Sequence, residues 1–155
     1  MSSRALPSVI LFLIASSVGS AQAPTDSAEA RVRGVAGCYE LTVSEWSPAD
    51  RNAAYHRIPG RIRLDTVRAA LGRGRVLSPN IAYPHHGAFP GTPNWNTTGD
   101  TLRLVWSNGF QLTIVKLENR DSVWSGEAVA ESDDRPIPPQ PLPRARVVAR
   151  RAPCR

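Results

Sequence analysis

The chain has 155 residues, of which 41% are apolar and 21% are charged, and it contains 14 prolines. This length suits one domain and is too short for two, the apolar fraction excludes disorder along the whole chain, and the prolines exclude a helical bundle or a long coiled coil. The formal net charge of +6 is carried almost entirely by arginine, which leaves anionic partners open.

The first 23 residues have the pattern of a secretory signal peptide. Arg4 supplies a positive start, residues 9–15 a short apolar stretch, and residues 19–23 a small-residue exit. The apolar stretch is well short of the roughly 20 residues that cross a bilayer, and no later stretch approaches that length. We therefore expect a periplasmic or extracellular protein without a transmembrane segment, cleaved after Ala21 or after Ala23.

Residues 24–36 are polar and aperiodic, which predicts a flexible leader ahead of a domain over residues 37–155. Within this region, residues 35–38 have the sequence Val-Ala-Gly-Cys, which is similar to the lipobox of bacterial lipoproteins. In lipoproteins that box follows the apolar stretch directly, whereas here charged residues such as Asp26 and Arg31 intervene. Because charges are costly to bury in a membrane, we expect no lipidation.

The domain begins with two segments in which apolar and polar residues alternate, the period of a half-buried β-strand. The residues that share a face are Tyr39, Leu41 and Val43 in the first segment and Ile62 and Leu64 in the second, over residues 60–67. Between them, Ser47 and Pro48 followed by Asp50 predict a short helix to about residue 55. Residues 75–77 predict a short partner strand.

Residues 78–99 interrupt the strand pattern with prolines, glycines and scattered aromatic residues, and we expect a long loop of functional or mobile character. His85 and His86 lie there, but adjacent histidines on an extended chain point in different directions and a metal site needs further ligands. Asp133 and Asp134 lack the spacing of a calcium loop. We therefore predict no metal site and no cofactor.

The clearest local signal is a β-hairpin, in which Asn108 and Gly109 join two alternating runs. The alternating residues are Leu102, Leu104 and Trp106 before the turn and Phe110, Leu112 and Ile114 after it. A second turn at residues 118–121 leads into a strand over residues 123–131. In that strand we assign to the inner face Trp124, Gly126 and Ala128. A last strand over residues 145–152 follows a proline-rich connection.

Cys38 and Cys154 are the only cysteines, and they lie at the two ends of the predicted domain. An even count in an exported chain predicts one disulfide. The bridge requires Cα atoms within about 7 Å of each other, so the first and last strands must be neighbours. Neither cysteine lies in a C-x-x-C motif or near a histidine in sequence, so we expect a structural pair without redox or metal chemistry.

Six to eight antiparallel strands with tethered ends predict an all-β fold, a single antiparallel β-barrel with one short helix. A β-sandwich is the alternative. We favour the barrel over the sandwich because a closed sheet has none of the exposed edges that an open sheet of this size would leave.

The segment Gly37–Leu41, followed by Trp46, resembles the first strand of lipocalin-like (calycin) barrels, which open with glycine, one residue, an aromatic residue and an alternating strand. Residues 109–128 also resemble the middle of such small secreted barrels. The chain departs from the pattern because it has Tyr39 where the family usually has tryptophan, directly after a cysteine. The resemblance implies an apolar barrel interior that can open at one mouth to a small hydrophobic molecule. The chain is also similar to uncharacterised exported bacterial proteins rich in arginine and proline, which implies no function.

The candidate ligand-binding residues are Tyr39, Leu104, Trp106, Phe110 and Trp124. They line a cavity if the barrel is hollow, but side chains can also fill a barrel of about eight strands completely. No Gly-x-Ser-x-Gly motif is present, and nothing selects an acid–base pair among the 13 acids, so we predict no catalytic residue.

These observations predict an exported, monomeric, non-catalytic barrel protein that binds a small apolar ligand. One alternative is a structural or envelope-surface module that binds an anionic envelope polymer through its arginine-rich exterior. A second alternative is an enzyme whose site the sequence does not reveal. We expect no nucleic-acid partner, because the chain carries an export signal and lacks a recognition motif.

Overall fold

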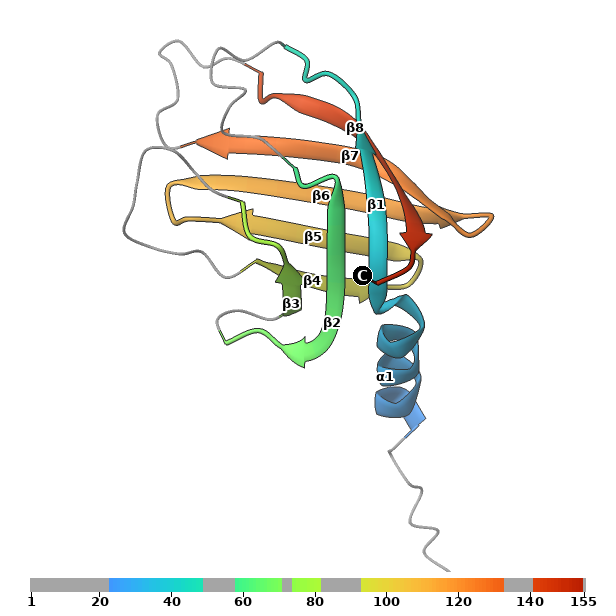
Figure 1. The fold of residues 1–155 in the computed structure, drawn as a ribbon. Coiled ribbons are helices and arrows are strands. Elements are labelled where there is room, and N and C mark those ends of the chain that lie inside the picture. Colours follow the sequence, from blue (N-terminus) through green and yellow to red (C-terminus); the bar gives the residue numbers. More distant parts are fainter. Residues whose placement is uncertain (1–22, 49–57, 71–73, 82–92, 133–140, 155) are drawn as a thin grey trace, which may run out of the picture.

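The computed structural model describes residues 23–48, 58–70, 74–81, 93–132 and 141–154. Its strands form one closed antiparallel barrel of eight strands in sequence order, in which the last strand pairs with the first (Figure 1). The predicted all-β barrel is therefore confirmed, and the alternative sandwich is excluded. The described residues contain no helix that is long and apolar enough to cross a membrane.

One helix precedes the strands. The elements are α1 (Ala23–Val35), β1 (Gly37–Val43), β2 (Arg61–Arg68), β3 (Arg75–Ser78), β4 (Asn94–Thr98), β5 (Thr101–Ser107), β6 (Gln111–Arg120), β7 (Val123–Ser132) and β8 (Arg144–Ala152).

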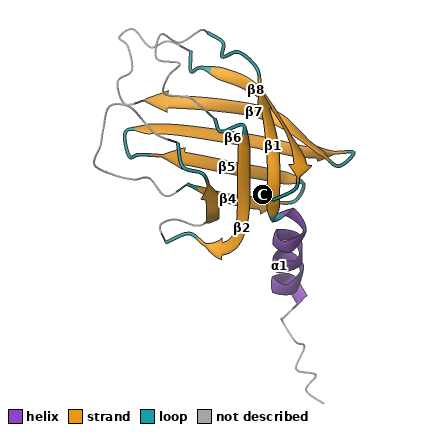
Figure 2. Cartoon of the chain, in the orientation of Figure 1, coloured by secondary structure: helices purple, strands orange, loops and turns teal. Residues whose placement is uncertain are grey.

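The two ends of the barrel differ (Figure 2). At the helix-capped end, α1 leads into β1, β8 finishes, and short connections join β2 to β3, β4 to β5 and β6 to β7. At the loop-bearing end, β1, β3 and β7 finish, β2, β4 and β8 begin, and a tight turn joins β5 to β6.

The Cys38 and Cys154 Cα atoms are 5.2 Å apart, and the two residues form a disulfide. The bridge lies where β1 pairs with β8, with Cys38 opposite Ala152. The predicted pairing is confirmed, and it ties the first and last strands together at the helix-capped end.

Residues 24–36 were predicted to be a flexible leader, and this was wrong because α1 occupies Ala23–Val35. Val35 is buried and Val32 packs against the barrel core, while Glu29 forms an ion pair with Arg75 of β3. Short isolated helices are marginal in water, and most helical stability in proteins comes from tertiary packing. The sequence of α1 has no clear apolar stripe, so local pattern alone could not reveal it.

The loop predicted over residues 78–99 contains β4, so its end was misassigned. Trp95 is the only apolar residue of that strand, and one residue cannot display an alternation. It pairs with Leu104 of β5 and is fully buried. The rest of the predicted loop, with His85 and His86, falls mostly outside the described residues, as do Asp133 and Asp134.

The short helix predicted from Ser47 to about residue 55 also falls largely outside the described residues. Ser47 itself forms an isolated β-bridge with Arg144, so this residue extends the β1–β8 pairing.

The alternation proposed for Phe110, Leu112 and Ile114 selected the wrong face of β6. The buried side chains of that strand are Gln111, Thr113, Val115 and Leu117. Residues opposite each other on antiparallel strands share a face, and Trp106 lies opposite Thr113. The hydrophobicity of the three residues was misleading, whereas the register of the hairpin sets the face. In β7, Trp124 and Ala128 are buried as predicted. Gly126 is exposed, but it lies opposite the buried residues Leu117 of β6 and Val147 of β8, so the register places it on the inner face as predicted.

Candidate functional site

Four of the five residues predicted to line a ligand site belong to the buried core, and the fifth, Phe110, does not. Tyr39, Leu104, Trp106 and Trp124 are buried in the barrel core. Phe110 lies in the β5–β6 turn with 44% of its surface exposed, because the hairpin register turns it away from the interior. Their role in binding stays a prediction.

Of the four buried residues, Leu104 lies in the middle of β5 and the other three lie toward one end of the barrel or the other. Tyr39 belongs to the start of β1 and Trp124 to the start of β7, so both lie toward the helix-capped end. Trp106 lies near the end of β5, toward the loop-bearing end, where its indole N–H donates a hydrogen bond to the Pro79 carbonyl at 3.1 Å.

The helix-capped end is closed by contacts between α1, β1 and β8. The Tyr39 hydroxyl donates a hydrogen bond of 2.6 Å to the Val35 carbonyl. Arg151 of β8 donates to the carbonyls of Gly34 and Ala36, and its guanidinium carbon lies 5.6 Å from the centroid of the Tyr39 ring. The planar guanidinium thus pairs with an aromatic ring and with the last turn of α1 at the same time.

The loop-bearing end brings polar side chains into the barrel interior. The buried polar residues of the described chain are Asn108, Gln111 and Thr113. Asn108 accepts hydrogen bonds from the backbone N–H groups of Phe110 and Gln111 at 3.0 and 2.7 Å, and its amide nitrogen donates to the Gln111 side-chain oxygen at 3.3 Å. These contacts fix the turn, and they satisfy polar groups that would otherwise be costly to bury.

Thr113 differs from these two residues because its hydroxyl has no hydrogen-bond partner among the described residues, although the side chain has no exposed surface. Its cross-strand neighbours on the inner face are Trp106 on β5 and Ala130 on β7. An unsatisfied buried hydroxyl costs about 1–3 kcal/mol. The hydroxyl is therefore an unused donor and acceptor between two apolar cross-strand neighbours.

Small side chains cover one wall of the interior. The buried alanines of β7 and β8 are Ala128, Ala130, Ala145 and Ala149, whereas β4 and β5 contribute Trp95, Leu104 and Trp106. Trp95, Leu104 and Trp106 have no exposed surface, so the large side chains occupy the space that the alanines leave. In this structure the described interior is closed to solvent around them.

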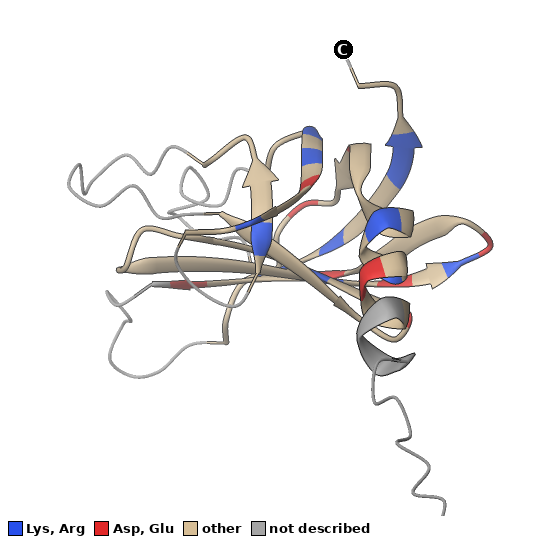
Figure 3. Cartoon of the chain, turned by 90° about the horizontal axis from the view of Figure 1, so that it is seen from below, with Lys and Arg blue, Asp and Glu red and all other residues tan. Residues whose placement is uncertain are grey.

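The outer surface is basic, but its charges are spread over several strands and α1 (Figure 3). On adjacent strands β2, β1 and β8, the exposed charged residues include Arg61, Arg63, Arg144, Arg146, Arg150 and Glu40. Arg61 pairs with Glu40 at 2.5 Å, and Arg144 pairs with Glu127 of β7 at 2.5 Å. Exposed pairs of this kind add little stability. Among the residues that the structure describes, no group of three or more His, Cys, Asp or Glu could hold a metal ion.

Sequence reasoning missed Gln111 and Thr113 as interior residues because it followed hydrophobicity along β6. The signal that could have found them is the hairpin itself. Once Trp106 is assigned to the interior, the residue opposite it must face inward too.

Comparisons of the chain with protein-family models, with curated proteins and with solved structures give no match. The chemistry of the site is therefore the basis for its interpretation.

Proposed function

We propose that this chain is an exported, non-catalytic barrel protein of the lipocalin-like type that binds one small, mostly apolar molecule in the loop-bearing half of the barrel. Three observations support this proposal. The barrel is closed with eight antiparallel strands, its first strand carries the Gly37–Leu41 pattern, and the N-terminal 23 residues have the pattern of a signal peptide. The single disulfide suits an oxidising compartment.

The observation that carries the proposal is the unpartnered hydroxyl of Thr113. The apolar residues Trp106 and Ala130 lie opposite Thr113 on the neighbouring strands, so a ligand there needs an apolar body for burial and one hydrogen-bonding group for the hydroxyl. Ligand pockets typically combine a hydrophobic lining with a few placed polar groups. This chemistry favours an uncharged molecule with a single polar group, such as a long-chain alcohol, ketone or ester.

A ligand must open the interior to reach Thr113, because Trp106 and Thr113 have no exposed surface. The helix-capped end is held by the disulfide, α1 and Arg151. Opening is therefore expected at the loop-bearing end, where Trp106 and Pro79 meet. Binding then shifts the protein toward a state in which the side chains near Thr113 have moved apart.

A fluorescence titration with 1-decanol tests the proposal, because Trp106 is the cross-strand neighbour of Thr113. We expect a saturable change in tryptophan emission, and an affinity about tenfold lower in Thr113→Val, which removes the hydroxyl at nearly constant shape. The matched control is Thr42→Val, since Thr42 is exposed on β1. No saturable change in the unmodified protein, or equal losses in both variants, would contradict the proposal.

The arginine-rich exterior supports a second candidate function, the binding of an anionic envelope polymer by a filled barrel. The observation behind it is the excess of arginine over acid on β2, β1 and β8. Contacts of this type are screened by salt. Retention on immobilised polyanion that is lost between about 0.05 and 0.5 M NaCl, together with no response to 1-decanol, would favour this function over the first.

A further inference from the structure

A pocket of about 170 Å³ lies at the helix-capped end, between α1 and strands β2, β3 and β4. Its lining residues are Val32, Arg68, Gly74, Arg75, Trp95, Asn96 and Thr97. It lies at the opposite end of the barrel from Thr113 and is independent of the proposed function.

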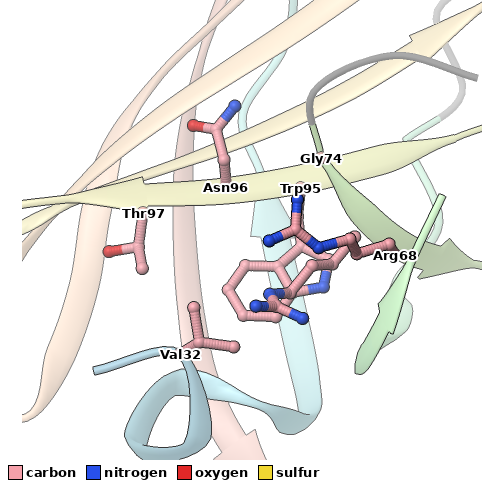
Figure 4. Close-up of a pocket in the computed structure, with 7 residues that line it drawn as sticks. Val32, Arg68, Gly74, Trp95, Asn96 and Thr97 are labelled. Carbon is pink, nitrogen blue, oxygen red and sulfur yellow. The ribbon is translucent and has the colours of Figure 1, made fainter. Parts of the chain in front are cut away.

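Two arginines meet in this pocket because of strand register. Arg68 at the end of β2 lies opposite Arg75 of β3, and Arg75 lies opposite Trp95 of β4. Paired residues share a face, so both arginines lie on the Trp95 side of the sheet, where Trp95 is buried, Arg75 is half-buried and Arg68 is exposed to solvent. Figure 4 shows the Arg68 side chain beside the Trp95 ring, with Val32 of α1 facing the same ring. Like charges directly opposite each other are destabilising, so a negative charge close to the two arginines would stabilise them.

The protein supplies only part of that counter-charge. Glu29 of α1 pairs with Arg75 at 2.5 Å, and Arg75 also donates to the Thr66 carbonyl. Arg75 is thereby held, with 14% of its side chain exposed. Arg68 has no hydrogen-bond or ion-pair partner among the described residues. Two guanidinium groups and one carboxylate leave one positive charge in excess at the pocket.

We propose that this pocket binds a small monocarboxylate, with Arg68 as the principal ligand. A single negative charge neutralises the excess, whereas a dianion would place a net negative charge beside Glu29. The free guanidinium of Arg68 presents a fork of donors that matches a carboxylate. Val32 and Trp95 provide apolar walls for the rest of the molecule. In Figure 4, Asn96 points to the other side of β4 from Arg68 and Trp95, so its side chain is not counted as a ligand group.

The volume of the pocket limits the size of the anion. At about 30 Å³ for each water in the liquid, 170 Å³ holds about five or six waters, or an organic anion with a similar number of heavy atoms. Acetate, propanoate and other short monocarboxylates have this size.

The test is an NMR titration of the full mature chain at constant ionic strength, which follows the Trp95 indole N–H that donates to the Asp65 carbonyl. Propanoate is the probe, with inorganic phosphate as the dianion. We expect a saturable shift with propanoate, weaker binding of phosphate, and an affinity at least about tenfold lower in Arg68→Gln. Thr113→Val should leave this binding unchanged.

The matched control is Arg63→Gln, which removes the same charge from the exposed face of the same strand. Its affinity for propanoate should stay within about twofold of the unmodified protein, because exposed charges at a distance are screened. Arg68→Gln should melt no lower than the unmodified protein, since it removes a like-charge pair. Equal losses in both variants, no saturable shift, or tighter binding of phosphate than of propanoate would overturn the proposal.

Discussion

The two ends of the barrel are stabilised in different ways. At the helix-capped end, the Cys38–Cys154 disulfide, the docked α1 and the Arg151 contacts join segments from the start and the finish of the chain. At the loop-bearing end, the Ser47–Arg144 backbone bridge and the Trp106–Pro79 hydrogen bond also join distant segments, but no disulfide or docked helix is among the described contacts. The β5–β6 turn there is held by local hydrogen bonds, beside a buried hydroxyl for which the described residues supply no partner. The helix-capped end is therefore held by a covalent bond and a docked helix, while the loop-bearing end contains one buried hydroxyl, that of Thr113, that adds nothing to stability. Variants at the two ends should therefore have opposite effects.

Loss of the disulfide is expected to lower the unfolding free energy more than any other change. The double variant Cys38→Ser, Cys154→Ser should lose about 2–5 kcal/mol of unfolding free energy, because the bridge closes a loop over 116 residues of sequence separation. Urea unfolding measures the loss, and each single variant should lose a similar amount because one missing sulfur already breaks the bridge. A midpoint unchanged by reduction of the unmodified protein would show that the helix-capped end does not depend on the bridge.

Gly126→Ala should cost about 2–4 kcal/mol, since large losses follow when a side chain has no space. A Cβ at Gly126 would lie 2.0 Å from the Lys116 carbonyl oxygen of β6, a backbone atom that cannot give way cheaply. The control is Gly60→Ala, where a Cβ meets nothing within 4 Å. Equal unfolding free energies for the two variants would mean that β6 and β7 do not approach this closely.

Arg151→Gln should cost about 1–2 kcal/mol, because it removes hydrogen bonds to Gly34 and Ala36 and the contact with the Tyr39 ring. Hydrogen exchange should locate the loss in α1, while the amides of the β5–β6 turn stay protected. Arg150→Gln changes the adjacent exposed arginine and serves as the control. If exchange accelerates equally in α1 and in the β5–β6 turn, the closure is not local to one end.

The smallest expected change is an increase in the unfolding free energy, whereas the variants above lower it. Thr113→Val should raise the unfolding free energy of the ligand-free protein by about 1 kcal/mol, because it removes a buried hydroxyl that has no partner. Thr97→Val should lower it by about 0.5–1.5 kcal/mol, since the Thr97 hydroxyl donates to the Thr101 carbonyl. Thermal or urea unfolding of both variants measures the contrast. A loss of stability in Thr113→Val would show that the hydroxyl is satisfied within the protein.

Much of the fold could be predicted from the sequence because alternation is visible wherever a strand carries several apolar residues on one face, as in β1, β2 and β5. The cysteine positions added the long-range constraint that brings β1 beside β8. Two elements could not be predicted from the sequence, for the same physical reason. Both α1 and β4 owe their stability to tertiary contacts, those of Val35 and Trp95, and neither has a periodic pattern of its own.

The candidate sites could be predicted less well than the fold. Thr113 and Gln111 are polar residues on an inner face, so a search for apolar positions passes over them. The arginine pocket depends on the pairing of Arg68 with Arg75 across two strands, which requires the register and not the composition. In both cases the groups proposed to bind a ligand break the local pattern, because a polar residue faces the interior or a charged residue lies beside the buried core.

The most direct test of the central claim is an NMR experiment that measures proton–proton contacts between bound 1-decanol and protein labelled at its threonine methyl groups. The proposal predicts contacts from the carbon-1 protons of the alcohol to the Thr113 methyl group and to the Trp106 ring, and none to Thr42 on the outer face. Contacts confined to exposed apolar side chains such as Phe110 or Val67 would contradict it and leave the barrel interior as a filled core.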